Sequence, residues 1–193
     1  MKIVGVGCGP GLLTEVAIQV IKNASIIYGS DRAIELAHPH ILPNCLVKTI
    51  DDFKSLHKLP NEAVVLSTGD PMLAGLGYLN GEVISGISSL QIAAARLRIP
   101  MARIVSIVAH GKGHKQGMHD TIKEIKQKKI VFLLADPKFN VQELFKKLRD
   151  LCLPLQIAVC ENLGYLEERI EIGSVESPPK VSADLFSLLI GNF

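Results

Sequence analysis

The segment VVLSTGDPMLAGLG, residues 64–77, decides the fold class, because it joins an apolar strand directly to a glycine-rich loop. Residues 63–66 form a short apolar run that predicts a fully buried strand. The turn-forming cluster Ser67-Thr68-Gly69-Asp70-Pro71 follows at its carboxyl end. Gly75 and Gly77 come next, and their missing Cβ atoms would let the backbone approach a ligand. In open parallel sheets, ligands bind beyond the carboxyl ends of strands, so this loop is a candidate binding site, although an ordinary strand-to-helix turn has the same composition.

The same arrangement recurs on both sides of this segment. Residues 2–6 predict a strand leading into GVGCGPG (5–11), and residues 82–85 predict one leading into Ser85-Gly86-Ile87-Ser88-Ser89. Further strands are predicted at 25–28 and 46–50. One helix is predicted to begin after Thr14 and another to end at Ala37. A short helix capped by Asp51 and a helix over 90–97 capped by Ser88 are also predicted. Strands alternating with helices predict a parallel, doubly wound sheet. The loops after its first, fourth and fifth strands could then converge on one pocket.

The order of the predicted strands and helices changes after Pro100. Strands are predicted at 103–109, 130–135, 155–160, 168–173 and 185–190, with helices at 117–128 and 141–151. The last two strands have no helix between them, so this half is expected to be a mixed sheet. We place a domain boundary near Met101, which gives domains 1–101 and 102–193 with the ligand site expected in the cleft between them.

Composition excludes several classes of protein. Hydrophobic residues make up 48% and charged residues 21% of the 193, which is typical of a globular protein, and a net charge of +2 is too small to indicate nucleic-acid binding. The amino terminus lacks a signal peptide's apolar stretch and no run approaches the roughly 20 residues that span a bilayer, so a cytoplasmic protein is expected. The cysteines show no CxxC pair or metal-ligand spacing, so no metal is predicted; they are Cys8, Cys45, Cys152 and Cys160.

Two other motifs leave alternatives open. GVGCGPG is similar to a dinucleotide-binding fingerprint. The acidic residue expected about 20 positions further on is missing, although Asp31 lies near that position. The sequence contains no P-loop motif. His110, Lys112, His114 and Lys115 form a histidine- and lysine-rich stretch after a long strand. This stretch is predicted to be either a solvated loop or a loop facing an anion. A metal site is disfavoured because no carboxylate is close in the sequence to complete a ligand set.

Taken together, these residues resemble the tetrapyrrole (corrin and porphyrin) methylases, a two-domain class (class III) of S-adenosylmethionine (SAM)-dependent methyltransferases. The resemblance runs from Ile3 to the last predicted strand, and GDP followed by GISS at this distance is fairly specific for the class. The other matching motifs are Leu13-Thr14 after the glycine–proline loop, residues 91–97, Val105-Ser106, His110-Gly111, Glu161-Asn162-Leu163-Gly164 and Glu168-Arg169.

The resemblance implies a parallel-sheet amino-terminal domain, a mixed-sheet carboxy-terminal domain, and SAM in the cleft between them. It implies that the cofactor is bound by Pro10, Gly69, Asp70, Met72, Leu73, Ser88, Ser89, Leu134 and Asn162. Gly7 and Gly9 of the first loop would face the tetrapyrrole, with Arg32 and His110 holding its carboxylates, since a guanidinium binds carboxylate through two hydrogen bonds.

The implied activity is SAM-dependent C-methylation of a cobalt-precorrin macrocycle, at carbon 5, in cobalamin biosynthesis. Positioning a ring carbon in line with the methyl group can supply about 7–11 kcal/mol, so no nucleophile on the protein is required, and no general base is identified. Alternatives are another enzyme of the class, acting at a different precorrin position or forming diphthine, and a non-catalytic tetrapyrrole-binding protein. The expected partners are a second copy of the chain and the companion decarboxylating precorrin methyltransferase.

Three departures from the family pattern stand in or near these loops. The first loop is one residue shorter, with Cys8 where the family has proline, and Ser85 replaces the proline before Gly86. The segment before His110 is slightly longer. The first two put individual cofactor contacts in question.

Overall fold

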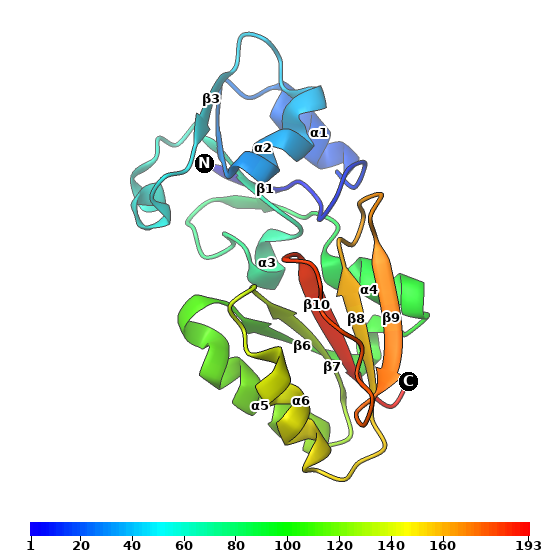
Figure 1. The fold of residues 1–193 in the computed structure, drawn as a ribbon. Helices are drawn as coiled ribbons and strands as arrows, with labels where there is room; N and C mark the ends of the chain where they lie inside the picture. Colours follow the sequence, from blue (N-terminus) through cyan, green and yellow to red (C-terminus); the bar gives the residue numbers. More distant parts are fainter. The chain divides into compact units, whose positions relative to one another are not determined.

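A computed structural model describes residues 1–193, and the chain divides into two compact units, residues 1–88 and residues 89–193 (Figure 1). The division lies before the apolar helix α4 (Ser89–Leu97), whereas the sequence analysis placed the boundary after it. The two divisions differ in the placement of α4, and the domain limits 1–101 and 102–193 stay a prediction.

The first unit is built on a five-stranded parallel sheet, as predicted. Its strands are β1 (Lys2–Gly5), β2 (Ile26–Gly29), β3 (Leu46–Thr49), β4 (Val64–Ser67) and β5 (Glu82–Ile84), in the order β3-β2-β4-β1-β5. Every hydrogen-bonded pair in this sheet is parallel. All four residues of β4 are buried, which explains its continuous apolar run.

The helices of this unit begin at side-chain caps. Thr14 accepts a hydrogen bond from the Ala17 N–H ahead of α1 (Glu15–Lys22), and Ser30 caps α2 (Asp31–Ala37) in the same way. A 3₁₀ turn, η1, covers His38–His40. The prediction that Asp51 caps the next helix is wrong. The segment is a 3₁₀-helix, η2 (Phe53–Lys58), and Asp52 caps it because its extended backbone lets Oδ1 accept from the Lys54 N–H at 2.9 Å.

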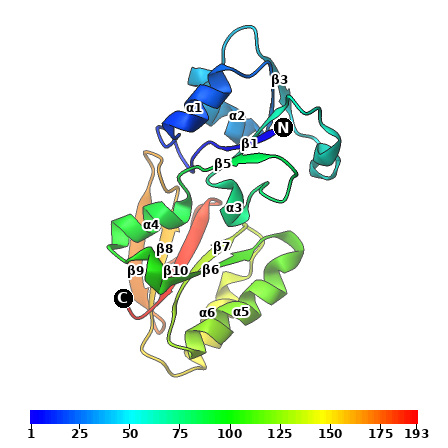
Figure 2. The same cartoon turned by 180° about the vertical axis from the view of Figure 1, so that it is seen from behind.

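The second unit contains a mixed sheet, as predicted. Its strands are β6 (Ile104–Ala109), β7 (Ile130–Ala135), β8 (Gln156–Glu161), β9 (Arg169–Ser174) and β10 (Phe186–Gly191), in the order β6-β7-β10-β8-β9. Only β6 and β7 pair in parallel. Helices α5 (His114–Lys126) and α6 (Val141–Arg149) share one hydrophobic core with this sheet, and α4 lies on the side opposite α6, near β8 and β9 (Figure 2).

Helix α5 begins three residues earlier than predicted. Short 3₁₀ turns, η3 (Met101–Arg103) and η4 (Gly111–Gly113), flank β6, and η4 runs directly into α5. Gly117, expected at the helix start, lies inside the helix. A Cβ there would lie 2.5 Å from the Ala109 Cβ on β6, which explains the glycine. The glycine thus permits close helix-to-strand packing. None of the helices combines the length and hydropathy needed to cross a bilayer.

Candidate functional site

In the first unit, the three glycine-rich loops meet at one edge of the sheet. They follow β4, β1 and β5, which are neighbours in the sheet and parallel, so their carboxyl ends lie side by side. Gly7 and Gly69 exchange two backbone hydrogen bonds, of 3.3 and 2.8 Å, and the Cys8 N–H donates to the Ile87 C=O at 2.9 Å. The predicted convergence of these loops is confirmed.

Glycine is required where the three loops touch. A Cβ on Gly86 would lie 2.2 Å from the Gly69 carbonyl oxygen, and a Cβ on Gly5 would lie 2.5 Å from the Gly86 nitrogen. Gly69 has φ +71°, a left-handed conformation that favours glycine, but open space surrounds its Cβ position up to Ser88 Cα at 3.9 Å. Backbone therefore packs directly on backbone at Gly5 and Gly86, and Gly69 allows the turn.

The interpretation of Gly75 and Gly77 as points of ligand approach is wrong. A Cβ on Gly75 would meet Ser67 Oγ at 2.2 Å, and a Cβ on Gly77 would meet Met72 Sδ at 2.5 Å. The chain itself fills the space beside both glycines. They allow the loop after α3 (Pro71–Ala74) to fold back on that helix, where the Gly77 N–H donates to the Pro71 C=O at 3.0 Å.

Asp70 links two of the loops through its carboxylate. Oδ1 accepts from the Met72 N–H at 2.8 Å, which caps α3, and Oδ2 accepts from the Gly86 N–H at 3.0 Å. Both carboxylate oxygens are thus used within the protein. The carboxylate therefore holds the loop after β5 against the loop after β4.

The remaining predicted residues of this unit lie in these loops or close to the same edge. Pro10 is exposed, and Met72, at 68% exposure, presents a large apolar side chain to its surroundings. Leu73 is half-buried and Ser88 is buried, whereas Ser89, which is half-buried, is the first residue of α4 and of the second unit. Arg32, in the first turn of α2, follows β2, whose carboxyl end borders that of β4. Gly7 and Gly9 are buried, and a Cβ on Gly7 would overlap Leu12, so the fold already explains the glycine at position 7.

In the second unit, Asp136 organises the stretch that contains His110. It accepts hydrogen bonds from the Gly111 N–H at 2.6 Å, the Lys138 N–H at 2.9 Å and His114 Nε2 at 2.8 Å. The Gly111 N–H in particular lowers the pKa of Asp136 to about 2, with His114 adding to the effect. His114 therefore lies on a helix and pairs with a carboxylate, so the prediction that it belongs to a loop with no nearby carboxylate is wrong.

His110 stands directly after β6, at the carboxyl end of the parallel pair β6–β7. Burial of its imidazole is the largest influence and lowers its pKa, while Asp136 opposes that change. The lowered pKa favours the neutral form of the ring. It can accept a hydrogen bond as well as donate one.

Ser187 is a candidate site residue that sequence reasoning missed. Its hydroxyl oxygen is buried without a hydrogen-bond partner, and it lies directly opposite Leu134 of β7 and Cys160 of β8 in the sheet register. Opposite residues share a face of the sheet, so Leu134 and Ser187 point to the same side. An unpaired buried hydroxyl beside a predicted cofactor residue fits a bound ligand with a polar group there. The only signal in the sequence was one serine in an otherwise apolar strand.

Asn162, directly after β8, adopts φ +49°, which is uncommon outside glycine but tolerated by asparagine. Its N–H donates to the Leu185 C=O at 2.9 Å, and its C=O accepts from the Tyr165 N–H at 2.9 Å. These bonds use the backbone only, which leaves the side-chain amide for a ligand.

Comparison with known proteins places this geometry in a family. The family model of the Tetrapyrrole (Corrin/Porphyrin) Methylases matches residues 2–179. The chain belongs to the tetrapyrrole methylases. It is 33% identical over 190 residues to a protein of Methanocaldococcus jannaschii described as a probable cobalt-precorrin-7 C(5)-methyltransferase, covering 89% of this chain and 88% of that one.

Solved structures agree on the fold of this tetrapyrrole methylase. The cobalamin biosynthesis precorrin-6Y methylase CbiE from Archaeoglobus fulgidus has a TM-score of 0.78 at 27% identity, covering 100% of this chain and 98% of that one. The methyltransferase CobJ has a TM-score of 0.82 at 17% identity, covering 99% and 93%, and shows a shared fold alone.

The departures of this methylase from the family pattern leave the loop contacts in place. Cys8 stands where the family has proline, and its N–H makes the hydrogen bond to Ile87 that proline could not donate. The Ser85 C=O accepts from the Thr14 hydroxyl at 3.3 Å, a bond that uses only the backbone of residue 85. Both changes are therefore compatible with the convergence of the three loops.

Replacing Asp70 by alanine should destabilise the methylase and loosen the loop after β5. The change leaves the Met72 and Gly86 N–H groups without their acceptor, so we expect the free energy of unfolding in urea to fall by about 2 kcal/mol. Asp52→Ala is the matched control, since it removes one exposed cap and should cost about 1 kcal/mol or less. Equal losses of unfolding free energy in the two variants would show that the hydrogen bond from the Gly86 N–H adds nothing to stability.

Proposed function

We propose that this protein transfers a methyl group from SAM to carbon 5 of a cobalt-precorrin macrocycle in cobalamin biosynthesis. The observation that carries the proposal is the convergence of three loops at adjacent strand ends, held by Gly7–Gly69, Cys8–Ile87 and Asp70–Gly86 hydrogen bonds. The choice of substrate rests on the 33% identity to the probable cobalt-precorrin-7 C(5)-methyltransferase.

The proposed cofactor contacts come from both units. The first unit would supply Pro10, Gly69, Asp70, Met72, Leu73 and Ser88, and the second unit would supply Ser89, Leu134 and Asn162. Three features support this assignment: the exposed Met72 side chain, the backbone-anchored Asn162, and the unpaired Ser187 hydroxyl beside Leu134. Bound SAM supplies an activated methyl group. The task of the protein is therefore to bind and orient the two reactants and to exclude water. No nucleophile on the protein is needed for this.

The substrate is proposed to lie against Gly7 and Gly9, with Arg32 and His110 binding carboxylates on its rim. Arg32 can form two parallel hydrogen bonds to a carboxylate. The His110 ring can donate one hydrogen bond to a carboxylate in its neutral form, which its lowered pKa favours.

Calorimetry with SAM, its demethylated product S-adenosylhomocysteine and NAD tests the cofactor first. We expect one SAM site per chain and no NAD binding. Incubation with SAM carrying an isotope-labelled methyl group and cobalt-precorrin-7, followed by mass spectrometry and NMR of the product, then tests the position. A labelled carbon other than carbon 5 would favour a different corrin-pathway methylase. SAM binding with methylation of a protein histidine derivative would favour diphthine formation, and tetrapyrrole binding without SAM binding would favour a non-catalytic protein.

Arg32→Ala and His110→Ala should each raise the KM for the tetrapyrrole while leaving the Kd for SAM nearly unchanged. Loss of a charge-assisted hydrogen bond from Arg32 costs about 1.5–3 kcal/mol, so we expect a rise of about tenfold or more, and a smaller rise for His110. Lys22→Ala, an exposed cation in the last turn of α1, is the control and should change neither constant. Loss of SAM binding in a folded Arg32 or His110 variant would contradict the division of roles.

We further propose a cytoplasmic homodimer that contacts its copy through the second unit, and an association with the companion decarboxylating precorrin methyltransferase. Large apolar side chains on the second unit support the dimer, because Ile172 is 51% and Leu185 40% exposed. Light scattering should give twice the chain mass of 20.9 kDa, and Ile172→Lys should lower it. A mass of one chain at micromolar concentration would rule out the dimer.

A further inference from the structure

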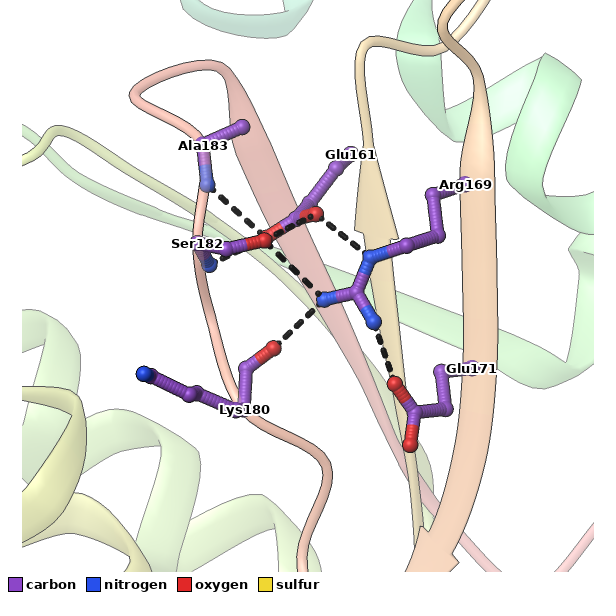
Figure 3. Close-up of polar contacts among 6 residues, drawn as sticks. All are labelled: Glu161, Arg169, Glu171, Lys180, Ser182 and Ala183. Atoms are coloured by element: carbon purple, nitrogen blue, oxygen red, sulfur yellow. Dashed lines mark hydrogen bonds and ion pairs between the residues drawn. The ribbon is translucent and has the colours of Figure 1, made fainter.

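Glu161, the last residue of β8, is a buried carboxylate surrounded by hydrogen-bond donors (Figure 3). Its side chain is only 2% exposed. Oε1 accepts from the Ser182 N–H at 2.5 Å and the Ala183 N–H at 3.0 Å, and Oε2 accepts from Arg169 Nε at 2.8 Å. The Ser182 hydroxyl lies within 3.2 Å of both oxygens. The carboxylate thus joins three separate segments of the second unit.

Arg169, the first residue of β9, extends the network on its other side. Its Nη2 donates to the Lys180 C=O at 2.6 Å and its Nη1 pairs with Glu171 (Figure 3). In the sheet register, Glu161 stands opposite Arg169 on one side and Phe186 on the other. The network therefore ties the end of β8 to the start of β9 and to the segment that enters β10.

Asn162 follows Glu161 immediately, and its backbone depends on the same segments. Its N–H donates to Leu185, three residues after Ser182, while the loop it begins is closed by Glu168. Glu168 accepts from the Gly164 N–H at 2.8 Å and from Arg96 Nε of α4 at 2.6 Å. The uncommon φ of Asn162 is therefore held between two anchored carboxylates, at residues 161 and 168.

We propose that Glu161 and Arg169 are positioning residues, which hold the Asn162 amide in the orientation that binds SAM. This inference rests on the proposed function, because it takes Asn162 as a cofactor contact. Burying an ion pair is costly, and apolar side chains could join the strands equally well. Unlike an apolar contact, the carboxylate makes directional hydrogen bonds, which place Ser182, Ala183 and Arg169 at defined positions. These bonds thereby fix the segment whose Leu185 C=O accepts from the Asn162 N–H.

Glu161→Gln is the decisive variant. Every neighbour of the carboxylate is a donor, so a glutamine amide must turn its NH₂ group toward another N–H whichever way it is oriented. We expect the Kd for SAM to rise about tenfold, as for the loss of one hydrogen bond to a charged group. We expect the KM for SAM to rise by the same factor, while kcat at saturating SAM falls less than threefold. Hydrogen exchange at the Asn162 N–H should become faster.

Glu171→Gln is the matched control, because it removes the outer, 52% exposed partner of Arg169 and leaves Glu161 untouched. It should leave the Kd for SAM within twofold of the wild-type value. Ser182→Ala keeps both backbone donors and removes only the hydroxyl, so it should raise the Kd by about two- to threefold and remains measurable if Glu161→Gln does not fold.

Calorimetry should be run at a temperature where circular dichroism shows every variant folded, with Asn162→Ala included. A wild-type protein that does not bind SAM would overturn the proposed function itself. If the wild type binds SAM and Asn162→Ala weakens binding, but folded Glu161→Gln and Ser182→Ala bind like the wild type, the positioning role is overturned while the function stands. A lower melting temperature in Glu161→Gln without a change in Kd would reduce the network to a purely structural role.

Discussion

Gly86→Ala should destabilise the first unit by about 3 kcal/mol or more, a large effect for the addition of one methyl group. The added Cβ would lie 2.2 Å from the Gly69 carbonyl oxygen and 2.8 Å from the Gly5 Cα, and both are backbone atoms that no side-chain rotation can move. Overpacking a core side chain usually costs about 1–3 kcal/mol, and backbone neighbours give way less easily. Chemical denaturation followed by circular dichroism measures this loss.

The same substitution should also weaken SAM binding, because relief of the overlap separates the loops after β4 and β5. Gly11→Ala is a suitable control. Gly11 has a positive φ of +73°, but no atom lies within 4 Å of its Cβ position. The substitution should therefore cost only the strain of a left-handed residue, about 1–2 kcal/mol. A Gly86→Ala variant as stable as Gly11→Ala would show that the loops are not packed backbone to backbone.

Acidification should unfold the second unit in a range set by Glu161. Burial alone would raise the pKa of Glu161, but Arg169, with the N–H groups of Ser182 and Ala183, holds it at about 2, against an ordinary value of 4.5. The unfolded chain therefore binds a proton at higher pH than the folded chain does. The stabilisation is fully present above pH 4.5 and is lost as the pH falls toward 2, a change of about 2–3 kcal/mol.

Urea titrations at pH 6, 4 and 3 measure this dependence. Glu161→Gln should be less stable than the wild type at pH 6 by about 3 kcal/mol, because it leaves buried donors and Arg169 without their acceptor, and the gap should narrow at pH 3. Asp136, whose pKa the Gly111 N–H lowers, contributes in the same direction, so Asp136→Asn should also flatten the curve. Glu143→Gln, a 49% exposed carboxylate on α6, is the control. A difference between wild type and Glu161→Gln that does not vary with pH would contradict the lowered pKa.

The sequence by itself determined the two kinds of sheet, the positions of nearly all strands, and the edge at which the first unit carries its loops. Strands buried on both faces read as nearly continuous apolar runs, so residues 63–66 and 130–135 could be assigned without tertiary information. Turn-forming residues directly after such strands placed the loops, and Thr14 marked a helix start because its side chain satisfies one of the first N–H groups. These features depend on local chemistry.

Only the tertiary structure decided what individual side chains in those loops do. Gly75, Gly77 and Gly117 looked alike in the sequence, yet each is required by a neighbour within 2.5 Å that lies on another turn or strand. Asp136 is 22 residues from His114 in sequence and 2.8 Å away in space, because β6 and β7 are parallel and end together. The same holds for Glu161 and Ser182, and for the unpaired hydroxyl of Ser187 beside Leu134. Hydrogen bonding and close packing depend on distances between segments that the order of residues does not contain, and the folded sheet is what sets those distances.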